Sequence, residues 1–432
     1  MRLSASFPVD NLTFWKEQLE NWSSGHTVFM LLDSNDHHSP LLDTGWDVLV
    51  GAGAAQTLQL SVGKAFEGLK TWQTQTNDWL FGVLGYDLKN EVEQLSSEHP
   101  DGIGFPDLLF FQPETVVGIS GGLLVVHTLV ETPEKVLEAI RTAPRQPRLP
   151  AAVPPKMLPR IATADYLDTV AAIRRHIVAG DVYEMNFCQE FFAENTTIDP
   201  LAVWDTLNKL ARAPMAAFFR WHDRYLLSAS PERFLKKEGK KLLSQPIKGT
   251  RRRAVVDDEA TRAALANSEK DRAENVMIVD LVRNDLARSC QSGTVEVPEL
   301  FGIYTFETVH QMISTVTGQL RPSVHPIDAL QYAFPPGSMT GAPKVMAMEL
   351  IEDYEKTRRG LYAGALGYFD PAGNFDFNVL IRSVFYHQTA QYVSFQVGGA
   401  IVFDSVAEDE LDECRVKAGA LFAALGALQP AQ

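Results

Sequence analysis

The chain has 432 residues, of which 45% are hydrophobic and 22% are charged, and its formal net charge is −15. This length suits two domains or one large composite domain, and the apolar content excludes wholesale disorder. An acidic chain repels phosphate backbones and anionic lipids, so we expect no nucleic-acid or membrane partner. Small anionic ligands can still bind where basic groups are concentrated.

The cysteines and the N-terminal sequence indicate a cytoplasmic protein. Cys188, Cys290 and Cys414 are far apart and form no CxxC motif, so we expect neither a disulfide framework nor a zinc site. The sequence MRLSASFPVDNLTFW has no apolar run ahead of a cleavage site, which predicts no signal peptide. The weakly polar stretch 116–126 is too short to span a bilayer.

A proline-rich segment divides the sequence into two regions. Residues 144–159 contain six prolines, which predicts an extended connector because proline lacks the N–H that helices and central strands require. The N-terminal region, residues 1–143, has strand-like runs HTVFMLL, WLFGVLGY and GLLVVHTLV and a predicted helix at 132–142.

The region after the connector, residues 160–428, mixes helices and hairpins without regular βαβ alternation, which favours an α+β fold. In chain order we predict a helix over 164–180 ending at Gly180, a hairpin over 215–230, a helix capped at Ser268 and stopped by Gly293, successive strands over 364–399, and a final helix over 404–425.

Two acidic pairs are candidates for metal binding. Asp271 and Glu274 lie three residues apart on one predicted helix, and Glu410 and Glu413 lie three apart on another. Two such pairs could hold Mg²⁺, which takes oxygen ligands and keeps several waters. The alternative is structural, since acidic residues in a first helical turn also complement the helix dipole.

Two further segments carry candidate chemistry. The loop FPPGSMTGAPK leads into a helix with Pro343 as its expected first residue, and its backbone N–H groups could receive an anion; a plain loop-to-helix junction is equally consistent. In QPIKGTRRR, Lys248 lies in an apolar, glycine-flanked turn. Partial burial beside arginines would lower the pKa of its amine and make it a nucleophile, whereas the alternative is a solvated surface lysine.

Several scattered polar residues carry little signal alone. An arginine with a tyrosine can clamp a carboxylate, but a lone histidine or arginine is more often structural. The residues in question are Glu232, His310, Tyr362, Arg382 and Lys417.

Together these segments resemble the chorismate-utilising enzymes, which include anthranilate, aminodeoxychorismate, isochorismate and salicylate synthases. The resemblance is dense over residues 160–425 and rests on GDVYEMNFCQ, SASPERF, PIKGTRRR, KDRAENVMIVDLVRNDLAR, VHQMISTVTG, FPPGSMTGAPK, YAGALGYF, IRSVFY and DELDECRVKA. It implies one composite domain, with two antiparallel-rich sheets packed as a sandwich and helices outside.

Within this family, the third residue of PIxGT discriminates between branches. Lys248 occupies it here, as in the aminodeoxychorismate synthase component I branch, whereas anthranilate synthases carry alanine. Isochorismate and salicylate synthases have a water-activating lysine at the position of Glu184. This chain has no base of that kind there, which argues against water as the nucleophile. The alternatives are an anthranilate synthase component I and a non-catalytic paralogue.

The resemblance also implies a set of site residues. Glu274 and Glu413 would bind Mg²⁺ directly, and Asp271 and Glu410 would act through water. Lys248 would attack the substrate covalently, Glu232 would be the general acid, and His310 would either orient the substrate or transfer a proton. The implied substrate-binding residues are Gly249, Thr250, Thr340, Tyr362, Arg382, Gly398, Ala400 and Lys417.

The implied reaction is amination of chorismate at C4 by ammonia, which gives 4-amino-4-deoxychorismate for 4-aminobenzoate and folate synthesis. No cysteine lies in a G-x-C-x-G elbow, so the resemblance implies a separate glutamine amidotransferase subunit as the ammonia source. An LLDS segment at Asp33 resembles one half of the family's tryptophan pocket, but APMAAFF replaces the expected NPSP-containing half, which argues against such a pocket.

Overall fold

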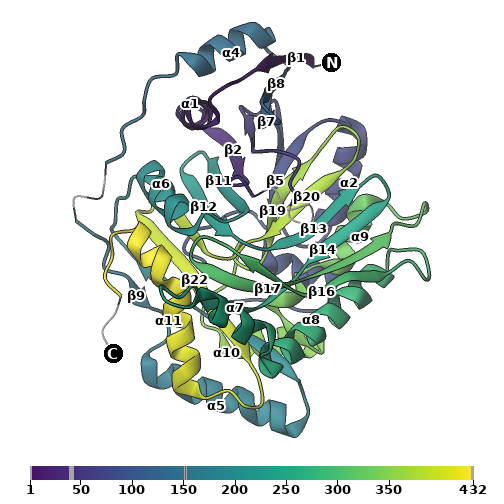
Figure 1. Cartoon of the computed structure of the whole chain (residues 1–432), viewed down its shortest axis with the longest axis vertical. Helices are drawn as coiled ribbons and strands as arrows, with labels where there is room; N and C mark the ends of the chain where they lie inside the picture. The colour runs from purple at the N-terminus through teal and green to yellow at the C-terminus, as the bar shows by residue number, and fades with distance from the viewer. Residues whose placement is uncertain (1, 38–42, 150, 152, 430–432) are drawn as a thin grey trace.

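The computed structural model describes residues 2–37, 43–149, 151 and 153–429, and two large antiparallel sheets dominate it (Figure 1). Helices lie on the outer faces, which confirms the expected α+β sandwich. The twelve-stranded sheet runs in the order β1 (Leu3–Pro8), β8 (Leu123–Thr128), β7 (Thr115–Ser120), β3 (Val48–Ala52), β2 (Val28–Asp33), β11 (Met215–Trp221), β12 (Arg224–Ser230), β21 (Ser383–His387), β22 (Tyr392–Ile401), β10 (Glu184–Ala193) and β18 (Gly341–Ala342), with β9 (Leu158–Pro159) also paired to β10.

The strand that contains Lys248 lies at one end of the ten-stranded sheet. Its order is β15 (Ile247–Arg252), β17 (Val309–Gln319), β14 (Lys241–Gln245), β13 (Arg233–Glu238), β20 (Phe375–Val379), β19 (Ala365–Phe369), β5 (Leu80–Leu84), β6 (Leu108–Gln112) and β4 (Gln56–Leu60), with β16 (Glu296–Thr305) also paired to β17.

The helices cover the outer faces and the ends of the sheets. They are α1 (Leu12–Ser24), α2 (Ala65–Thr76), α3 (Lys89–Val92), α4 (Pro133–Arg141), α5 (Thr163–Ala179), α6 (Pro200–Ala211), α7 (Asp258–Ala266), α8 (Glu269–Ala287), α9 (Pro326–Ala333), α10 (Lys344–Tyr354) and α11 (Ala407–Ala424), with short 3₁₀ turns at Tyr86–Leu88 and Gly337–Met339. None of the described helices is both long and apolar enough to cross a bilayer.

The main core lies between the two sheets. Met30 and Leu49 of the larger sheet pack in one buried cluster with Phe81 and Phe110 of the smaller sheet. Strands that face this core on one side and helices or loops on the other are buried throughout, as in β5, which explains their continuous apolar sequences. A second cluster lies between the larger sheet and its outer helices, among them α6 and α11.

Both sheets contain strands from either side of the proline-rich connector. Strands β2 and β5 precede it, and they pair with β11 and β19, which follow it. The connector passes over the outside of the molecule between α4 and β9 (Figure 1). Its Arg148 is bound to α1 and α6, with Nη2 3.4 Å from Glu20 and Nε 3.1 Å from Asp205.

Most predicted elements are confirmed, but several boundaries differ; the final helix, for example, begins at Ala407 and not at residue 404. The helix that begins after Ser268 ends at Ala287 instead of continuing to Gly293, because Cys290 leaves the helix to pair with Leu320. Pro343 is the N-cap of α10 and not its first residue, so the helix begins at Lys344.

Candidate active site

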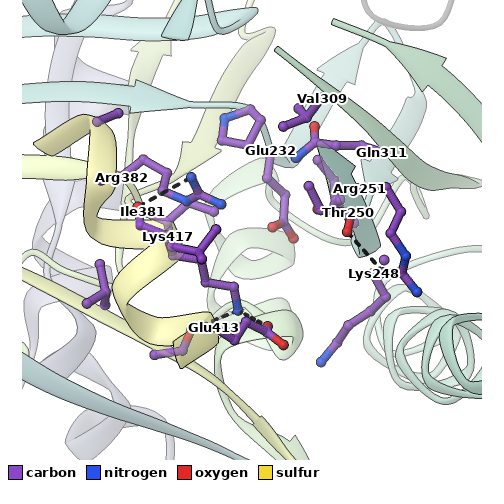
Figure 2. A pocket seen from close by; sticks show the side chains of 18 of the residues that line it. Glu232, Lys248, Thr250, Arg251, Val309, Gln311, Ile381, Arg382, Glu413 and Lys417 are labelled. Carbon is purple, nitrogen blue, oxygen red and sulfur yellow. Dashed lines mark hydrogen bonds and ion pairs between the residues drawn. The ribbon is translucent and has the colours of Figure 1, made fainter. Parts of the chain in front are cut away.

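A cavity of about 820 Å³ brings together most of the residues singled out from the sequence. Its walls are the strand β15, the end of β22, the first turns of α8, the helix α11 and the loop after β12. The predicted residues that line it are Glu232, Lys248, Gly249, Thr250, Asp271, Glu274, Tyr362, Arg382, Gly398, Ala400, Glu410, Glu413 and Lys417. Figure 2 shows Lys248, Glu232, Arg382 and Glu413 around the same space.

A local irregularity of β15 shapes the wall that carries Lys248. The register between β15 and β17 shifts between Ile247 and Thr250, as in a β-bulge. Gly249 has φ +88°, and a Cβ atom there would lie only 3.0 Å from Asp271 and from Leu265. Glycine is therefore required for β15 to approach α8 this closely.

The Lys248 amine is buried, as expected, but it is surrounded by acids. Its Nζ lies 3.3 Å from Oε1 of Glu184, and the residue is 9% exposed. Burial disfavours the charged amine, but Glu184, Glu274 and Glu232 outweigh that effect and raise the pKa of Lys248. The prediction of a lowered pKa is wrong, because the sequence did not reveal that carboxylates from three other segments face this amine.

Glu232 has the opposite character, that of a carboxyl group that keeps its proton. It lies in the loop between β12 and β13 and is 4% exposed. Burial raises its pKa to about 7, against the opposing effects of a hydrogen bond with Ser338 and the nearby charge of Lys248. A carboxyl group with such a pKa can donate a proton at neutral pH.

The two acidic pairs line the same cavity from two different helices, α8 and α11. Burial raises the pKa of Glu274 and of Glu410, whereas the Lys417 ammonium, 2.7 Å from Glu413, lowers the pKa of Glu413. Glu274 lies 4.0 Å from the Lys270 ammonium, and Glu410 accepts a hydrogen bond from Ser405. Asp271 binds Arg251 at 2.5 Å.

These carboxylates carry oxygen atoms, the type of ligand that a hard cation prefers. Among the residues that the structure describes, no group of three or more acidic, histidine or cysteine side chains is gathered closely enough to hold a metal ion. Mg²⁺ commonly takes only one or two protein carboxylates and keeps its waters. The loosely paired, partly buried Glu274 fits that requirement, because a cation would offset the cost of its charge.

Arg382 is a cation of the cavity that forms no ion pair with a carboxylate in the described part of the chain. Among the described residues its one hydrogen bond is a 3.5 Å contact from Nη1 to the carbonyl oxygen of Lys417, and burial lowers the pKa of its guanidinium. Its φ of +52° is a strained backbone conformation, of the kind that functional sites maintain. Tyr362 lines the same cavity, and its hydroxyl contacts Cys188 Sγ at 3.3 Å.

The end of β22 passes close to the acidic helix α11. A Cβ atom at Gly399 would lie 3.3 Å from Glu410 and 3.6 Å from Glu413. Lys417 donates a hydrogen bond to the carbonyl oxygen of Gly398 at 2.9 Å while it pairs with Glu413. Lys417 therefore ties the two elements together at the cavity wall.

Two predicted site residues are placed elsewhere. His310 is not among the described residues that line the cavity, although its neighbours Val309 and Gln311 are. The ring nitrogens of His310 contact Thr305 and Asp258, each at 2.9 Å, so it holds α7 against β17. Thr340 is fully buried and donates to the carbonyl oxygen of Gly337, while its neighbours Ser338 and Met339 line the cavity.

The sequence did not identify Glu184 as a partner of Lys248. Glu184, Asn186 and Cys188 alternate along β10 on one face, and Met185 and Phe187 occupy the opposite face in a buried cluster with α5. This alternation was a usable signal, because Asn186 lines the cavity and Glu184 lies on the same side of the strand.

The position near Asp33 that was compared with a tryptophan pocket contains a much smaller space. A cavity of about 30 Å³ lies there, with Trp46, Met215 and Tyr368 among its described lining residues. Its volume suits one or two water molecules better than an indole ring.

Comparison with known proteins now decides the family. The model of the chorismate binding enzyme family matches residues 27–423. The chain belongs to this family. Aminodeoxychorismate synthase component 1 of Salmonella typhimurium is 38% identical over 336 residues, which are 77% of this chain and 73% of the relative. Anthranilate synthase component 1 of Bacillus caldotenax is 36% identical over 375 residues, 80% of this chain and 73% of that protein.

A solved structure of the chorismate binding enzyme family has the same fold. Anthranilate synthase component I from Streptococcus pneumoniae superposes with a TM-score of 0.72 at 25% sequence identity, covering 98% of this chain and 92% of that one. Relatives named for two different reactions match this chain to similar extents, so the choice between those reactions rests on individual residues of the cavity.

Proposed function

We propose that the protein is the chorismate-aminating subunit of an aminodeoxychorismate synthase, an amino-group transferase that adds ammonia at C4 of chorismate. The observation that carries this proposal is the buried amine of Lys248, which lies in one cavity with the protonatable Glu232 and the guanidinium of Arg382. Relatives that carry the name aminodeoxychorismate synthase component 1 support it.

The reaction proceeds by two displacements. The Lys248 amine, once neutral, attacks C2 of the ring while the C4 hydroxyl leaves as water with the proton of Glu232. Ammonia then attacks C4, and the bond between C2 and Lys248 breaks. Covalent catalysis of this type divides one difficult substitution into two easier ones. The product is 4-amino-4-deoxychorismate.

The remaining residues bind and orient the dianionic substrate. Arg382 and Tyr362 receive the enolpyruvyl carboxylate, and the backbone near Gly249, Thr250, Gly398 and Ala400 receives the ring carboxylate. Glu274 and Glu413 would hold Mg²⁺, with Asp271 and Glu410 assisting through water, and the ion when bound would supply positive charge for the ring carboxylate. A separate glutamine amidotransferase subunit would supply ammonia, in a cytoplasmic complex.

The product identifies the reaction. The purified chain is incubated with chorismate, Mg²⁺ and an ammonium salt, and the product is analysed with and without an aminodeoxychorismate lyase. We expect 4-aminobenzoate only when the lyase is present. Fluorescent anthranilate formed without lyase would instead assign the chain to the anthranilate synthases.

The Lys248→Ala variant tests the covalent step. Because it removes the attacking amine, we expect at least a 100-fold fall in C4 amination. Lys248→Arg is the matched control, since it keeps a cation in the cavity without a nucleophilic amine and should be equally impaired. Unchanged C4 amination in either variant would contradict covalent catalysis by Lys248.

A further inference from the structure

The amine of Lys248 must lose a proton before it can attack, and its surroundings oppose that loss. Acidic side chains face it from several directions: Glu184 on β10, Glu232 in the loop after β12, Glu274 on α8 and, farther away, Glu413 on α11. Bulk solvent is a poor acceptor, because the residue is buried in the cavity that the substrate would fill. The proton acceptor must therefore be a protein group.

Among the described residues, Glu184 is the one acidic side chain within 4.0 Å of the Lys248 nitrogen, with Oε1 at 3.3 Å. Its other oxygen, Oε2, is buried and has no hydrogen-bond partner in the described part of the chain. The residue is 2% exposed and does not line the cavity, so it lies behind the amine as seen from the substrate. A lone buried carboxylate oxygen is costly unless it can accept a proton.

The backbone fixes this carboxylate in place. Glu184 is the first residue of β10 and pairs with Ala342 of β18, at the edge of the larger sheet. A Cβ atom at Gly341 would lie 2.2 Å from the carbonyl oxygen of Glu184, so β18 can approach only because residue 341 is glycine. The backbone of Glu184 is thus fixed at the sheet edge, in a place from which its carboxyl group reaches Lys248.

We propose that Glu184 is a positioning residue that takes the proton from Lys248 before the attack and returns it after the amine is released. This inference rests on the proposed function. The ammonium and carboxylate become a neutral amine and a carboxylic acid; the amine forms its bond to C2, and Glu232 gives its own proton to the departing hydroxyl. When ammonia displaces the amine, Glu184 gives its proton back, and the ammonium formed on the product restores the proton of Glu232.

The pH dependence of kcat distinguishes this role from a structural one. In the wild type the proton moves within the pair, so this step does not depend on pH. In Glu184→Gln the proton must leave to solvent, so the fraction of reactive amine rises tenfold per pH unit below its pKa. At alkaline pH both proteins lose kcat because Glu232 is deprotonated, and this loss cancels in the ratio of their kcat values.

The experiment measures kcat and KM for C4 amination from pH 6 to 8, with saturating Mg²⁺ and with constant free ammonia. We expect the ratio of wild-type to variant kcat to fall about tenfold per pH unit from pH 6 to 8, and KM for chorismate to change less than threefold. The slope is the decisive quantity, because Glu184→Gln also removes the carboxylate that most raises the pKa of Lys248 and so by itself increases the neutral amine. A ratio that is constant with pH would overturn the role of Glu184 as proton acceptor.

Two controls complete the test. Glu190→Gln removes another buried carboxylate of β10, one that pairs with Arg160, and its kcat ratio to wild type should not vary with pH. Product analysis separates the two claims. If the wild type forms 4-amino-4-deoxychorismate but the ratio is flat, only the role of Glu184 fails; if it forms isochorismate or anthranilate, the proposed function fails as well.

Discussion

Glu232 combines a catalytic requirement with a cost in stability. Its pKa of about 7 in the folded protein, against 4.5 for an ordinary glutamate, means that folding favours its protonated form. The stabilisation associated with that proton is complete below pH 4.5 and is lost as the pH rises through 7. The shift corresponds to about 3 kcal/mol of free energy of unfolding.

We therefore expect Glu232→Gln to be more stable than the wild type at pH 8, by up to about 3 kcal/mol, and similar in stability at pH 5. The same variant should lose at least 100-fold in kcat, because an amide cannot donate the proton that the leaving hydroxyl needs. Urea denaturation at the two pH values measures the first effect. An equal stability difference at pH 5 and pH 8 would contradict the raised pKa.

For the individual site residues, sequence motifs located the site, but spatial neighbours determined its electrostatics. The resemblance identified Lys248, Arg382 and both acidic pairs, all of which line the cavity. It could not reveal that Glu184 lies beside Lys248, because the pairing of β10 and the bulge of β15 bring these distant residues together. The pKa of an amine depends on such neighbours, so the predicted lowering of the Lys248 pKa was wrong.

Helix α8 carries two of the four acidic side chains, and its first turn depends on Ser268. The Ser268 hydroxyl accepts a hydrogen bond from the Asp271 N–H at 3.3 Å, as the cap predicted from the sequence requires. Removing this cap takes the acceptor away from the backbone N–H of Asp271 itself, one turn before Glu274.

We expect Ser268→Ala to lower the free energy of unfolding by about 1 kcal/mol. Ser268→Asp, which restores an oxygen acceptor at the cap, should retain most of the wild-type stability. Urea denaturation of the three proteins at pH 7 measures the difference. If the alanine and aspartate variants lost the same stability, the cap would contribute nothing.

Periodicity predicted the existence of elements better than their ends and faces. The pattern after Ser268 continued to Gly293, but pairing between Cys290 and Leu320 ends the helix earlier. In β17 alternate residues point in opposite directions, so Gln311 faces the cavity while His310 turns toward Asp258 on α7. Two consecutive polar residues in a strand point to opposite faces, and the sequence alone does not say which of them faces the cavity.

The proline-rich connector links the two regions of the chain and also contributes stabilising contacts to the whole molecule. Arg148 binds Glu20 on α1 and Asp205 on α6, and also donates to Asn21 at 2.8 Å. Burial and the nearby Asp205 raise the pKa of Glu20 to about 7, although Arg148 and Trp204 oppose the rise. Arg148 thus limits the repulsion between two acids that the fold places together.

We expect Arg148→Ala to lower the free energy of unfolding by about 1–3 kcal/mol. The pKa of Glu20 should rise further without the arginine, so the deficit is smallest at pH 5 and grows toward pH 8, where Glu20 must ionise. Arg145→Ala is the control, because Arg145 is largely exposed and its 3.5 Å pair with Glu17 should contribute little. A deficit that shrank with rising pH would contradict this account.

The exposed connector also determines how the molecule responds to a protease. Residues 144–149 are mostly accessible, whereas the strands on either side are interleaved in both sheets. A single cut there would leave two fragments that remain hydrogen-bonded along β2–β11 and β5–β19, so the nicked protein should elute from a sizing column as one particle. Each fragment expressed alone would expose unpaired strand edges and aggregate, and co-expression of the two would be needed to rebuild the cavity.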